Sequence, residues 1–458
     1  MPLEYLQPDG LLSMAERRQA GHDLRRLVPR RQQAAWQPPV QRRDPLDILV
    51  ENSRHRMSSL LPIRYGRMKQ SAFAFLRGSA AVMAADLATT PTSGIWVQSC
   101  GDCHFANFGF CTAADGTPLF DVIDFDETLP APFEWDIKRL ATSVAVDSLC
   151  RQLPERACHN LARCTVAAYR QHMARLMRLD PQQAWRSRIE ARRALEGIPA
   201  PRLRQRELRR MTAVVDAQRK GYRKLLERRR SGWRIRPQPP AIPAFPEHHD
   251  GTFELIARSA LETYKMSQSE ELGLLLDRYR LTDVAFKMVG IGSVGTFCAI
   301  GLYTDHDDAT LLLQLKEAQP SVLASHTASS VYVNQGQRVV TGQRIMQGTN
   351  DIFLGWTREH GTDQHCYVRQ LKDPRLADIG ESIADDALEH YAPLCGMTLA
   401  RAHARSGDAA RMTGYMGSGD SFDVAIADFA LAYAVQVEND WRLFLQAIKA
   451  GTIEARCE

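Results

Sequence analysis

The stretch that decides the fold is Ser99–Asp136, which reads SCGDCHFANFGFCTAADGTPLFDVIDFDETLPAPFEWD. Asp102 is followed five positions later by Asn107, and an apolar run after a glycine-containing turn predicts a short strand that leads to Asp124 and Asp126. A loop carboxylate, a loop amide and carboxylates at a strand end are the groups that a Mg²⁺–nucleotide site requires. We therefore predict that Asp102 is the catalytic residue and that Asn107, Asp124 and, as an auxiliary, Asp126 are the metal ligands.

Length and composition are those of an ordinary soluble protein. The chain has 458 residues, 44% apolar and 24% charged, which is enough for two or three cooperating units. Its N-terminus lacks the basic and apolar regions of a secretory signal, and no window approaches 18 consecutive apolar residues. We expect a cytoplasmic protein without a transmembrane segment, in which the ten cysteines are reduced thiols rather than a disulfide framework.

Changes in composition divide the chain into six segments. The run RPQPPAIPAFP at positions 236–246 is typical of a semi-rigid linker and marks the clearest boundary. We expect an N-terminal arm, the catalytic-loop part of a large lobe, an Arg-rich helical segment, the Pro-rich linker, a small nucleotide-binding lobe and the helical remainder of the large lobe. Their ranges are 1–45, 46–150, 151–236, 237–249, 250–372 and 373–458.

The Arg-rich segment carries most of the positive charge. Residues 151–236 contain 22 Arg and 2 Lys against 7 acidic residues, a net charge of +17 in a chain whose total is +5. Charge runs on helices usually mark solvated faces, and this is the interpretation we favour. The alternative is an acidic partner, such as a phosphorylated substrate, nucleic acid or an anionic lipid.

A second candidate site lies in the glycine loop, which we define as residues 290–295 (GIGSVG). A lone G-x-G-x-x-G pattern is a weak signal, and a dinucleotide-binding site would open a helix here, whereas strand-like sequence follows this loop. A further apolar strand ends on Lys316. This order is that of a kinase small lobe, in which the loop backbone covers nucleotide phosphates and the lysine contacts them. It predicts a cofactor site for ATP, and its residues are Gly290, Gly292, Ser293, Gly295 and Lys316. The alternative is a glycine-rich hairpin with a surface lysine.

Motifs in the chain resemble those of two known families. CGDCHFAN (100–107), VIDF (122–125) and WD (135–136) resemble the catalytic block of aminoglycoside- and choline-kinase-like phosphotransferases, whose pattern is HGDxxxxN, then IDF, then an Asp at a helix start. The chain as a whole resembles an uncharacterised bacterial family, domain of unknown function 2252, through FAFLRG (73–78), the glycine loop and QRVVTGQR (337–344). The first resemblance implies ATP- and Mg²⁺-dependent phosphotransfer to a hydroxyl of a small molecule or protein. The sequence does not identify this acceptor, nor the oligomeric state.

The order of the blocks implies a circularly permuted protein-kinase-like fold of class α+β. In ordinary kinases the small lobe precedes the catalytic loop, whereas here it follows about 190 positions later. The LARAH sequence at 399–403 resembles the L-A-x-x-H helix that leads into the catalytic loop. We therefore expect the break of the circular permutation to lie between that helix and the loop. The fold would then combine a small, mostly antiparallel five-stranded lobe with a large helical lobe.

Two departures from the kinase pattern bear on activity. Cys100 stands where the phosphotransferase pattern has His. No acidic residue occurs at positions 320–350, where a helix glutamate would pair with Lys316, and Glu317 is expected to point to the opposite face of its strand. A nucleotide-binding regulator without turnover is therefore a second hypothesis.

The residues around Asp102 are also compatible with different chemistry. A metal-dependent phosphohydrolase could use Asp102, His104, Asp124 and Asp126. The CGDCH sequence also matches the attachment pattern of c-type haem, and with Cys111 it could indicate zinc.

Overall fold

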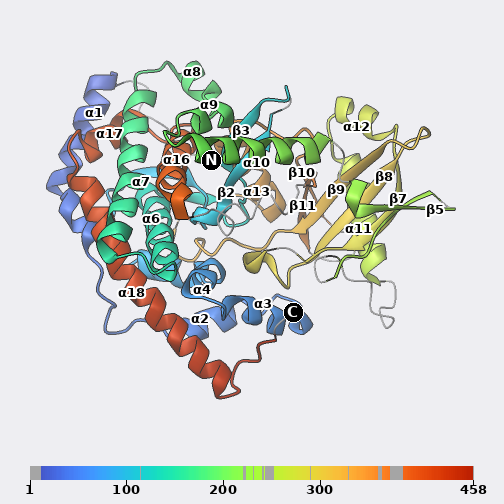
Figure 1. The fold of residues 1–458 in the computed structure, drawn as a ribbon, viewed down its shortest axis with the longest axis horizontal. Helices are drawn as coiled ribbons and strands as arrows, with labels where there is room; N and C mark the ends of the chain where they lie inside the picture. Colours follow the sequence, from blue (N-terminus) through green and yellow to red (C-terminus); the bar gives the residue numbers. More distant parts are fainter. Residues whose placement is uncertain are drawn as a thin grey trace.

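The computed structural model describes residues 12–456 except positions 114, 220–222, 231, 240–241, 243–251, 289, 328–329, 359–363 and 372–384. The fold is α+β, with an antiparallel five-stranded sheet at one end and a large helical part at the other (Figure 1). The Pro-rich linker predicted at 237–249 lies mostly outside the described residues, as do the first eleven residues of the predicted N-terminal arm.

The five-stranded sheet confirms the predicted antiparallel sheet between residues 250 and 372. Its spatial order is β10-β11-β9-β8-β7, and every neighbouring pair is antiparallel. The strands are β7 (Arg280–Phe286), β8 (Cys298–Thr304), β9 (Thr310–Glu317), β10 (Gly355–Arg358) and β11 (His365–Gln370). Helix α13 (Gln335–Met346) contains the QRVVTGQR run, lies between β9 and β10 in the chain and packs against β10 and β11.

The two faces of this sheet have different roles. Because side chains alternate along β9, Leu311, Leu313 and Leu315 point to one face, where they pack against α11 (Thr252–Met266). α12 (Glu270–Leu276) adds to this layer. Leu312 and Lys316 point to the other face, and Leu312 belongs to a small core there. The remainder of that second face, including Lys316, is turned toward the helical part.

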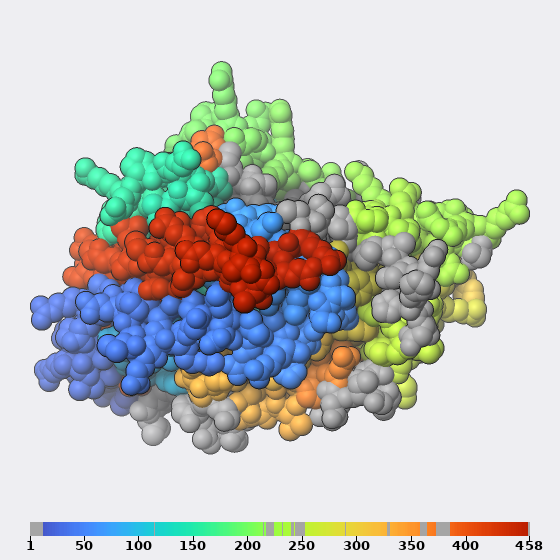
Figure 2. All heavy atoms as spheres, turned by 90° about the horizontal axis from the view of Figure 1, so that it is seen from below, coloured from blue at the N-terminus to red at the C-terminus, as the bar shows by residue number. Residues whose placement is uncertain are grey.

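The helical part is built around four long helices, α6 (Phe133–Cys150), α7 (Glu155–Leu176), α16 (Asp385–His403) and α18 (Ser421–Lys449). α7 packs closely along α16, and α18 crosses both α6 and α7. On one face of the molecule α18 lies along the N-terminal segment (Figure 2). That segment contains α1 (Met14–Asp23), α2 (Pro45–Glu51), α3 (Leu61–Met68), α4 (Ala72–Gly78) and α5 (Ala80–Leu87).

Two small antiparallel pairs of strands frame the Ser99–Asp136 stretch. β1 (Trp96–Ser99) pairs with β4 (Leu129–Pro132), and β2 (Phe108–Thr112) pairs with β3 (Pro118–Val122). The predicted strand before Asp124 is therefore β3, and the segment after Asp126 continues through β4 into α6. α17 (Ala409–Met416) packs against α1, so the described part of the predicted arm is a helical cap.

The Arg-rich segment is helical only in part. α7, α8 (Pro181–Arg186), α9 (Ala191–Glu196) and α10 (Pro201–Arg219) agree with the prediction, but β5 (Leu226–Arg229) and β6 (Gly232–Ile235) form a hairpin. The helical prediction was wrong here because Leu226 and Ile235 pack on the small core of the sheet's second face. The other residues of β5 are charged and half-buried or exposed, so the strand has no apolar alternation that would indicate it.

Within the described residues, no helix combines the length and apolar character needed to cross a membrane. The nine cysteines described there are all free thiols, in agreement with the expectation for the described part of the chain.

Candidate functional site

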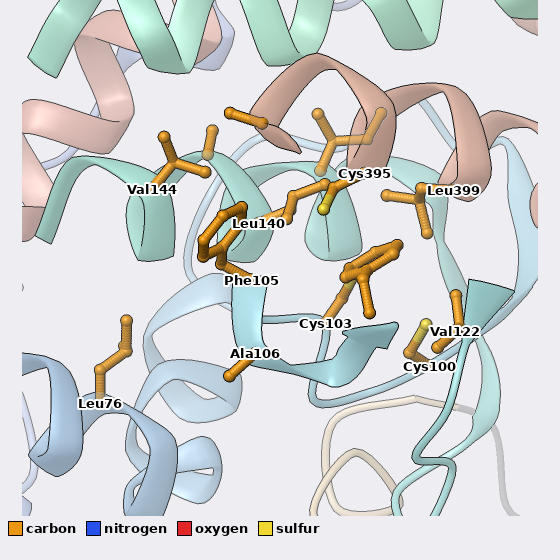
Figure 3. Close-up of a cluster of buried hydrophobic side chains, with 14 of the residues drawn as sticks. Leu76, Cys100, Cys103, Phe105, Ala106, Val122, Leu140, Val144, Cys395 and Leu399 are labelled. Carbon is orange, nitrogen blue, oxygen red and sulfur yellow. The ribbon is translucent and has the colours of Figure 1, made fainter. Parts of the chain in front are cut away.

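The loop of residues 100–107, which we call the Asp102 loop, is fixed by the helices beneath it. Asp136, in the first turn of α6, accepts hydrogen bonds from the backbone N–H groups of Cys100 (2.6 Å) and Gly101 (3.2 Å). His403 at the end of α16 contacts the same carboxylate through Nε2 at 3.1 Å. Apolar side chains of the loop pack between α6 and α16, where Phe105 points toward α6 (Figure 3). Backbone and core together therefore hold Asp102 in place.

Asp102 itself is paired with Arg139, one helical turn after Asp136. Arg139 Nε donates to Asp102 Oδ1 at 2.7 Å, and a second guanidinium nitrogen contacts the same oxygen. Burial raises the pKa of Asp102, and Arg139 opposes that rise. His104 Nε2 lies 3.7 Å from Asp102 Oδ2, and burial, with Arg77 and Arg139, holds the His104 pKa well below its usual value. Asp102 thus faces a cation on one side and a neutral imidazole on the other.

Asn107 and Asp124 offer oxygens toward the same space. Asn107 donates its amide N–H to the Asp102 carbonyl at 2.8 Å, which leaves the Asn107 side-chain oxygen available. One oxygen of Asp124 accepts the Phe125 N–H at 2.9 Å, and the Asp124 side chain is 37% exposed. These two groups suit a hard cation such as Mg²⁺ because both present oxygen ligands.

Both oxygens of Asp126 are occupied in this structure. Lys316 Nζ lies 2.6 Å from Asp126 Oδ2, Ser293 Oγ donates to the same oxygen at 3.0 Å, and the Tyr367 hydroxyl donates to Oδ1 at 2.6 Å. Burial opposes ionisation, but Lys316 and Tyr367 hold the Asp126 pKa at about 2. Lys316 is also 3.8 Å from Asp124 Oδ1. The lysine and the carboxylates are thus adjacent although Lys316 and Asp126 are 190 positions apart.

The glycine loop lies over this group of residues. Ser293 contacts Asp126, and a Cβ on Gly292 would be 4.0 Å from Asp102 Oδ2. Gly295 has φ +91°, a left-handed conformation that glycine adopts without strain. Gly290 has open space around its Cα, so nothing in the described structure requires glycine at that position.

A buried arginine of α13, Arg338, contacts the chain that follows Asp124. Arg338 is 1% exposed and donates to the backbone carbonyls of Asp126 (2.8 Å), Thr128 (2.6 Å) and Gln319 (2.8 Å). α13 therefore supports the chain after Asp124 through hydrogen bonds from Arg338 to backbone carbonyls. The absence of acidic residues at positions 320–350 left Lys316 without a predicted carboxylate partner. The carboxylate that pairs with Lys316 in the structure is that of Asp126.

A cavity of about 50 Å³ lies between the Asp102 loop and the glycine loop. Its lining residues are Arg56, Cys100, Asp102, Asn107, Asp124, Asp126, Glu127, Gly292, Ser293, Thr296, Glu317 and Gln319. Five of these are acidic, and burial raises the Glu127 pKa to about 7. Glu317 follows Lys316 on β9 and so points to the opposite face of the strand, as expected; it lines the cavity and accepts the Phe297 N–H at 2.9 Å. His104 does not line the cavity.

Cys100, Cys103 and Asp136 form the one group of three potential metal ligands found close together in the described residues. Asp136 already accepts the donors of the loop and His403, and burial raises the pKa of both thiols. Cys100, Cys103 and Asp136 therefore behave as buried groups of the core. Cys111 lies on β2, in a separate small cluster.

Sequence reasoning missed several residues of the site. Arg139 could have been found, because i, i+3 spacing from Asp136 puts both side chains on one face of a helix. Tyr367 faces Lys316 across the β9–β11 pair, which only the strand register reveals. Arg56 comes from a segment without a recognisable signal, and Arg338 lies in the QRVVTGQR run at 337–344, which does not indicate the contacts of its side chain.

The model of a protein family described as "Uncharacterized protein conserved in bacteria (DUF2252)" matches residues 56–447. No curated protein and no solved structure matches the chain.

Proposed function

The chain belongs to the bacterial family DUF2252, and from the geometry of its site we propose that it is an ATP- and Mg²⁺-dependent phosphotransferase with a circularly permuted kinase-like arrangement. The observation that carries the proposal is the meeting of Asp102, Asn107, Asp124 and the glycine loop at one cavity, with Lys316 beside it. These are the parts that kinase-type phosphotransfer uses, namely a base, two groups for metal, a backbone cover and a lysine.

The contacts between the blocks support the permuted order. Ser406, just after α16, accepts the N–H of Gln98 on β1 at 2.9 Å, so the end of that helix lies beside the strand that leads into the Asp102 loop. Lys316 lies on the third strand of the sheet counted along the chain, as the kinase lysine does. A permuted kinase-like chain would require both of these placements.

In the proposed reaction an acceptor hydroxyl attacks the γ-phosphorus of ATP. Its proton passes to Asp102, the new P–O bond forms to the acceptor oxygen, and the bond to the β-phosphate oxygen breaks with its electron pair remaining on ADP. Arg139 holds Asp102 ionised and oriented, which a buried carboxylate needs in order to accept a proton.

The residues present fit Mg²⁺ by their donor chemistry. The side-chain oxygen of Asn107 and the partly exposed carboxylate of Asp124 would hold it, and Asp126 could join only after releasing its present partners. When bound, Mg²⁺ neutralises phosphate charge. The excess of carboxylates in the cavity makes such neutralisation necessary for any triphosphate.

One observation favours a regulator that binds nucleotide without turnover. Lys316 is paired with Asp126, and no helix glutamate competes for it. If that pair holds the Lys316 ammonium away from the bound phosphates, the protein would bind nucleotide without transfer to an acceptor.

A thermal-shift panel with ATP, GTP and ADP, each with and without Mg²⁺, tests the proposal. Wild-type protein should gain about 2.7 kcal/mol of stability at a hundredfold excess of nucleotide over its dissociation constant. Asp124→Asn should remove the Mg²⁺-dependent part of that gain, Lys316→Ala should weaken binding as well as turnover, and Asp102→Ala should keep binding but lose transfer or ATP hydrolysis.

Three outcomes would contradict parts of this assignment. Equal Mg²⁺ dependence in Asp124→Asn and wild type would refute the metal ligands. Damage from His104→Ala as large as from Asp102→Ala, with activity independent of the glycine loop, would favour a phosphohydrolase. Binding of ATP–Mg²⁺ without γ-phosphate consumption, with any acceptor mixture, would favour the regulator.

A further inference from the structure

Arg56 joins the glycine loop to the helical part of the molecule. Its NH1 group donates to the Val294 carbonyl at 2.8 Å, and the next residue, Met57, donates its backbone N–H to the Gly295 carbonyl at 2.8 Å. A Cβ on Gly295 would be 3.0 Å from the Arg56 Cβ, so the two segments are in close contact. Arg56 is thus held at a fixed place beside the loop.

The guanidinium of Arg56 keeps an unsatisfied donor beside the cavity. Arg56 Nε is buried and has no hydrogen-bond acceptor in the described structure. Arg56 lines the cavity, and among the described residues it is the only cationic side chain that does so. Asp126, Glu127 and Glu317 are near enough to act on its charge, but within the described part of the chain none forms an ion pair with it.

A buried donor without an acceptor calls for an explanation, because most such groups in folded proteins are satisfied. Because the Val294 carbonyl holds NH1, the remaining guanidinium donors are left for a ligand in the cavity, and of these Nε is the buried one without an acceptor in the described structure. A planar guanidinium matches the oxygens of a phosphoryl group, and its charge does not depend on pH near neutrality. The cavity also contains Asp102 and the candidate metal ligands, between which the transferred phosphoryl group would lie.

We propose that Arg56 is a catalytic residue that donates from Nε to the phosphoryl group in transit, as an arginine finger supplied by the same chain. This inference rests on the proposed function. As the acceptor oxygen bonds to phosphorus, its proton goes to Asp102, and the β-phosphate oxygen leaves with the electron pair. Negative charge is then spread over the three oxygens of the phosphoryl group, where a positioned guanidinium is most effective. Lys316, which is paired with Asp126, is not among the residues that line the cavity.

The test compares Arg56→Gln with Arg54→Gln, a control at an exposed arginine two positions earlier that does not line the cavity. Thermal shifts are measured with ATP–Mg²⁺ and with ADP–Mg²⁺ plus aluminium fluoride, which mimics the planar phosphoryl group and needs no acceptor. ATP hydrolysis is followed in parallel. We expect Arg56→Gln to change the ATP–Mg²⁺ dissociation constant by less than about threefold, to lose the additional shift from aluminium fluoride, and to slow hydrolysis by about 10²- to 10³-fold. Arg54→Gln should behave as wild type.

The outcomes separate this inference from the proposed function. A wild-type protein that does not respond to ATP–Mg²⁺ overturns both. A responsive wild type with equal aluminium fluoride shifts in Arg56→Gln and Arg54→Gln overturns the role of Arg56 alone, as does an equal loss of ATP and aluminium fluoride binding, which would make Arg56 an anchor of the loop. If Arg56→Gln does not fold, Arg56→Lys keeps the charge without Nε, and a full aluminium fluoride shift in that variant would likewise overturn the role.

Discussion

At the scale of single residues, the ion pair of Asp102 and Arg139 contributes to the stability of the fold and also holds the proposed catalytic base. Arg139 is 2% exposed, so its loss would leave a buried carboxylate without its main counter-charge. Removing one partner of a buried ion pair usually costs about 3–5 kcal/mol, whereas removing both costs less than the sum of the single changes.

We predict that Arg139→Met lowers the free energy of unfolding by about 3 kcal/mol and that adding Asp102→Asn recovers part of this loss. Urea denaturation of the wild type, both single variants and the double variant measures the coupling. The carboxylate in Arg139→Met stays buried and unpaired, which is the reason for the penalty, and the amide in the double variant removes that charge. Strictly additive effects would show that the two side chains do not depend on each other.

His172 on α7 gives a prediction about pH. Burial lowers its pKa to about 4, and Arg175 and Arg401 add to this effect. The unfolded chain would bind a proton near pH 6.5, so between pH 6.5 and 4 the unfolded state holds more protons and stability falls as pH falls. The contribution is on the order of 3 kcal/mol over that range.

We predict that His172→Gln flattens the fall in unfolding free energy between pH 6.5 and 4. Chemical denaturation at several pH values measures it, with His22→Gln as control because the ring of His22 is exposed. An unchanged pH profile in His172→Gln would mean that other groups produce the acid sensitivity.

At the scale of elements, the close approach of α7 and α16 depends on a glycine. A Cβ on Gly396 would overlap the backbone carbonyl of Thr165, and the helix backbone there cannot yield as the end of a flexible side chain could. The contact fixes α16, whose last residue His403 supports the Asp102 loop. A substitution at Gly396 should therefore also disturb the Asp102 loop, because His403 of α16 supports that loop.

We predict that Gly396→Ala destabilises the fold by about 2 kcal/mol or more, because overpacking a tight helix contact forces the backbones apart. The matched control is Gly273→Ala on α12, where nothing lies within 4 Å and where alanine should stabilise by about 0.5–1 kcal/mol. Thermal unfolding of the two variants should shift in opposite directions. Equal shifts would indicate that the helices can separate without cost.

The elements also show what the sequence could predict. Leu311, Leu312, Leu313 and Leu315 form a short apolar run after the polar turn at 305–308, and such a run is typical of a strand buried on both faces. The β5–β6 hairpin was missed because only its contacts with the sheet, through Leu226 and Ile235, distinguish it from a helix rich in arginine. Tertiary packing decided the local structure there.

At the scale of the whole molecule, the candidate site joins segments that are far apart in the chain. The grouping of Asp102, Asn107 and Asp124 could be predicted from local sequence, since one loop and one strand position them. The contact of Lys316 with Asp126 could be expected only from the resemblance to a kinase, because no local pattern relates positions 190 apart. Arg56 and Arg338 could not be expected at all, since each enters the site through long-range packing.

The size of the cavity leads to the last prediction. A volume of about 50 Å³ is far below the roughly 300–1,000 Å³ of typical small-molecule sites, so the proposed binding of a nucleotide would require the glycine loop to lift from the helical part. Ser293 resists this motion by its hydrogen bond to Asp126. A hydrogen bond to a charged group contributes about 1.5 kcal/mol, which corresponds to about a tenfold change in the population of an open state. Ser293→Ala should therefore bind a fluorescent ATP analogue with Mg²⁺ about tenfold faster in stopped-flow experiments.

Ser267→Ala, at a serine whose hydroxyl donates to carbonyls on the sheet side, serves as control and should leave the rate unchanged. If Ser293 only contacted bound nucleotide, its loss would speed dissociation and leave association as it was, and the glycine loop would not limit entry to the site.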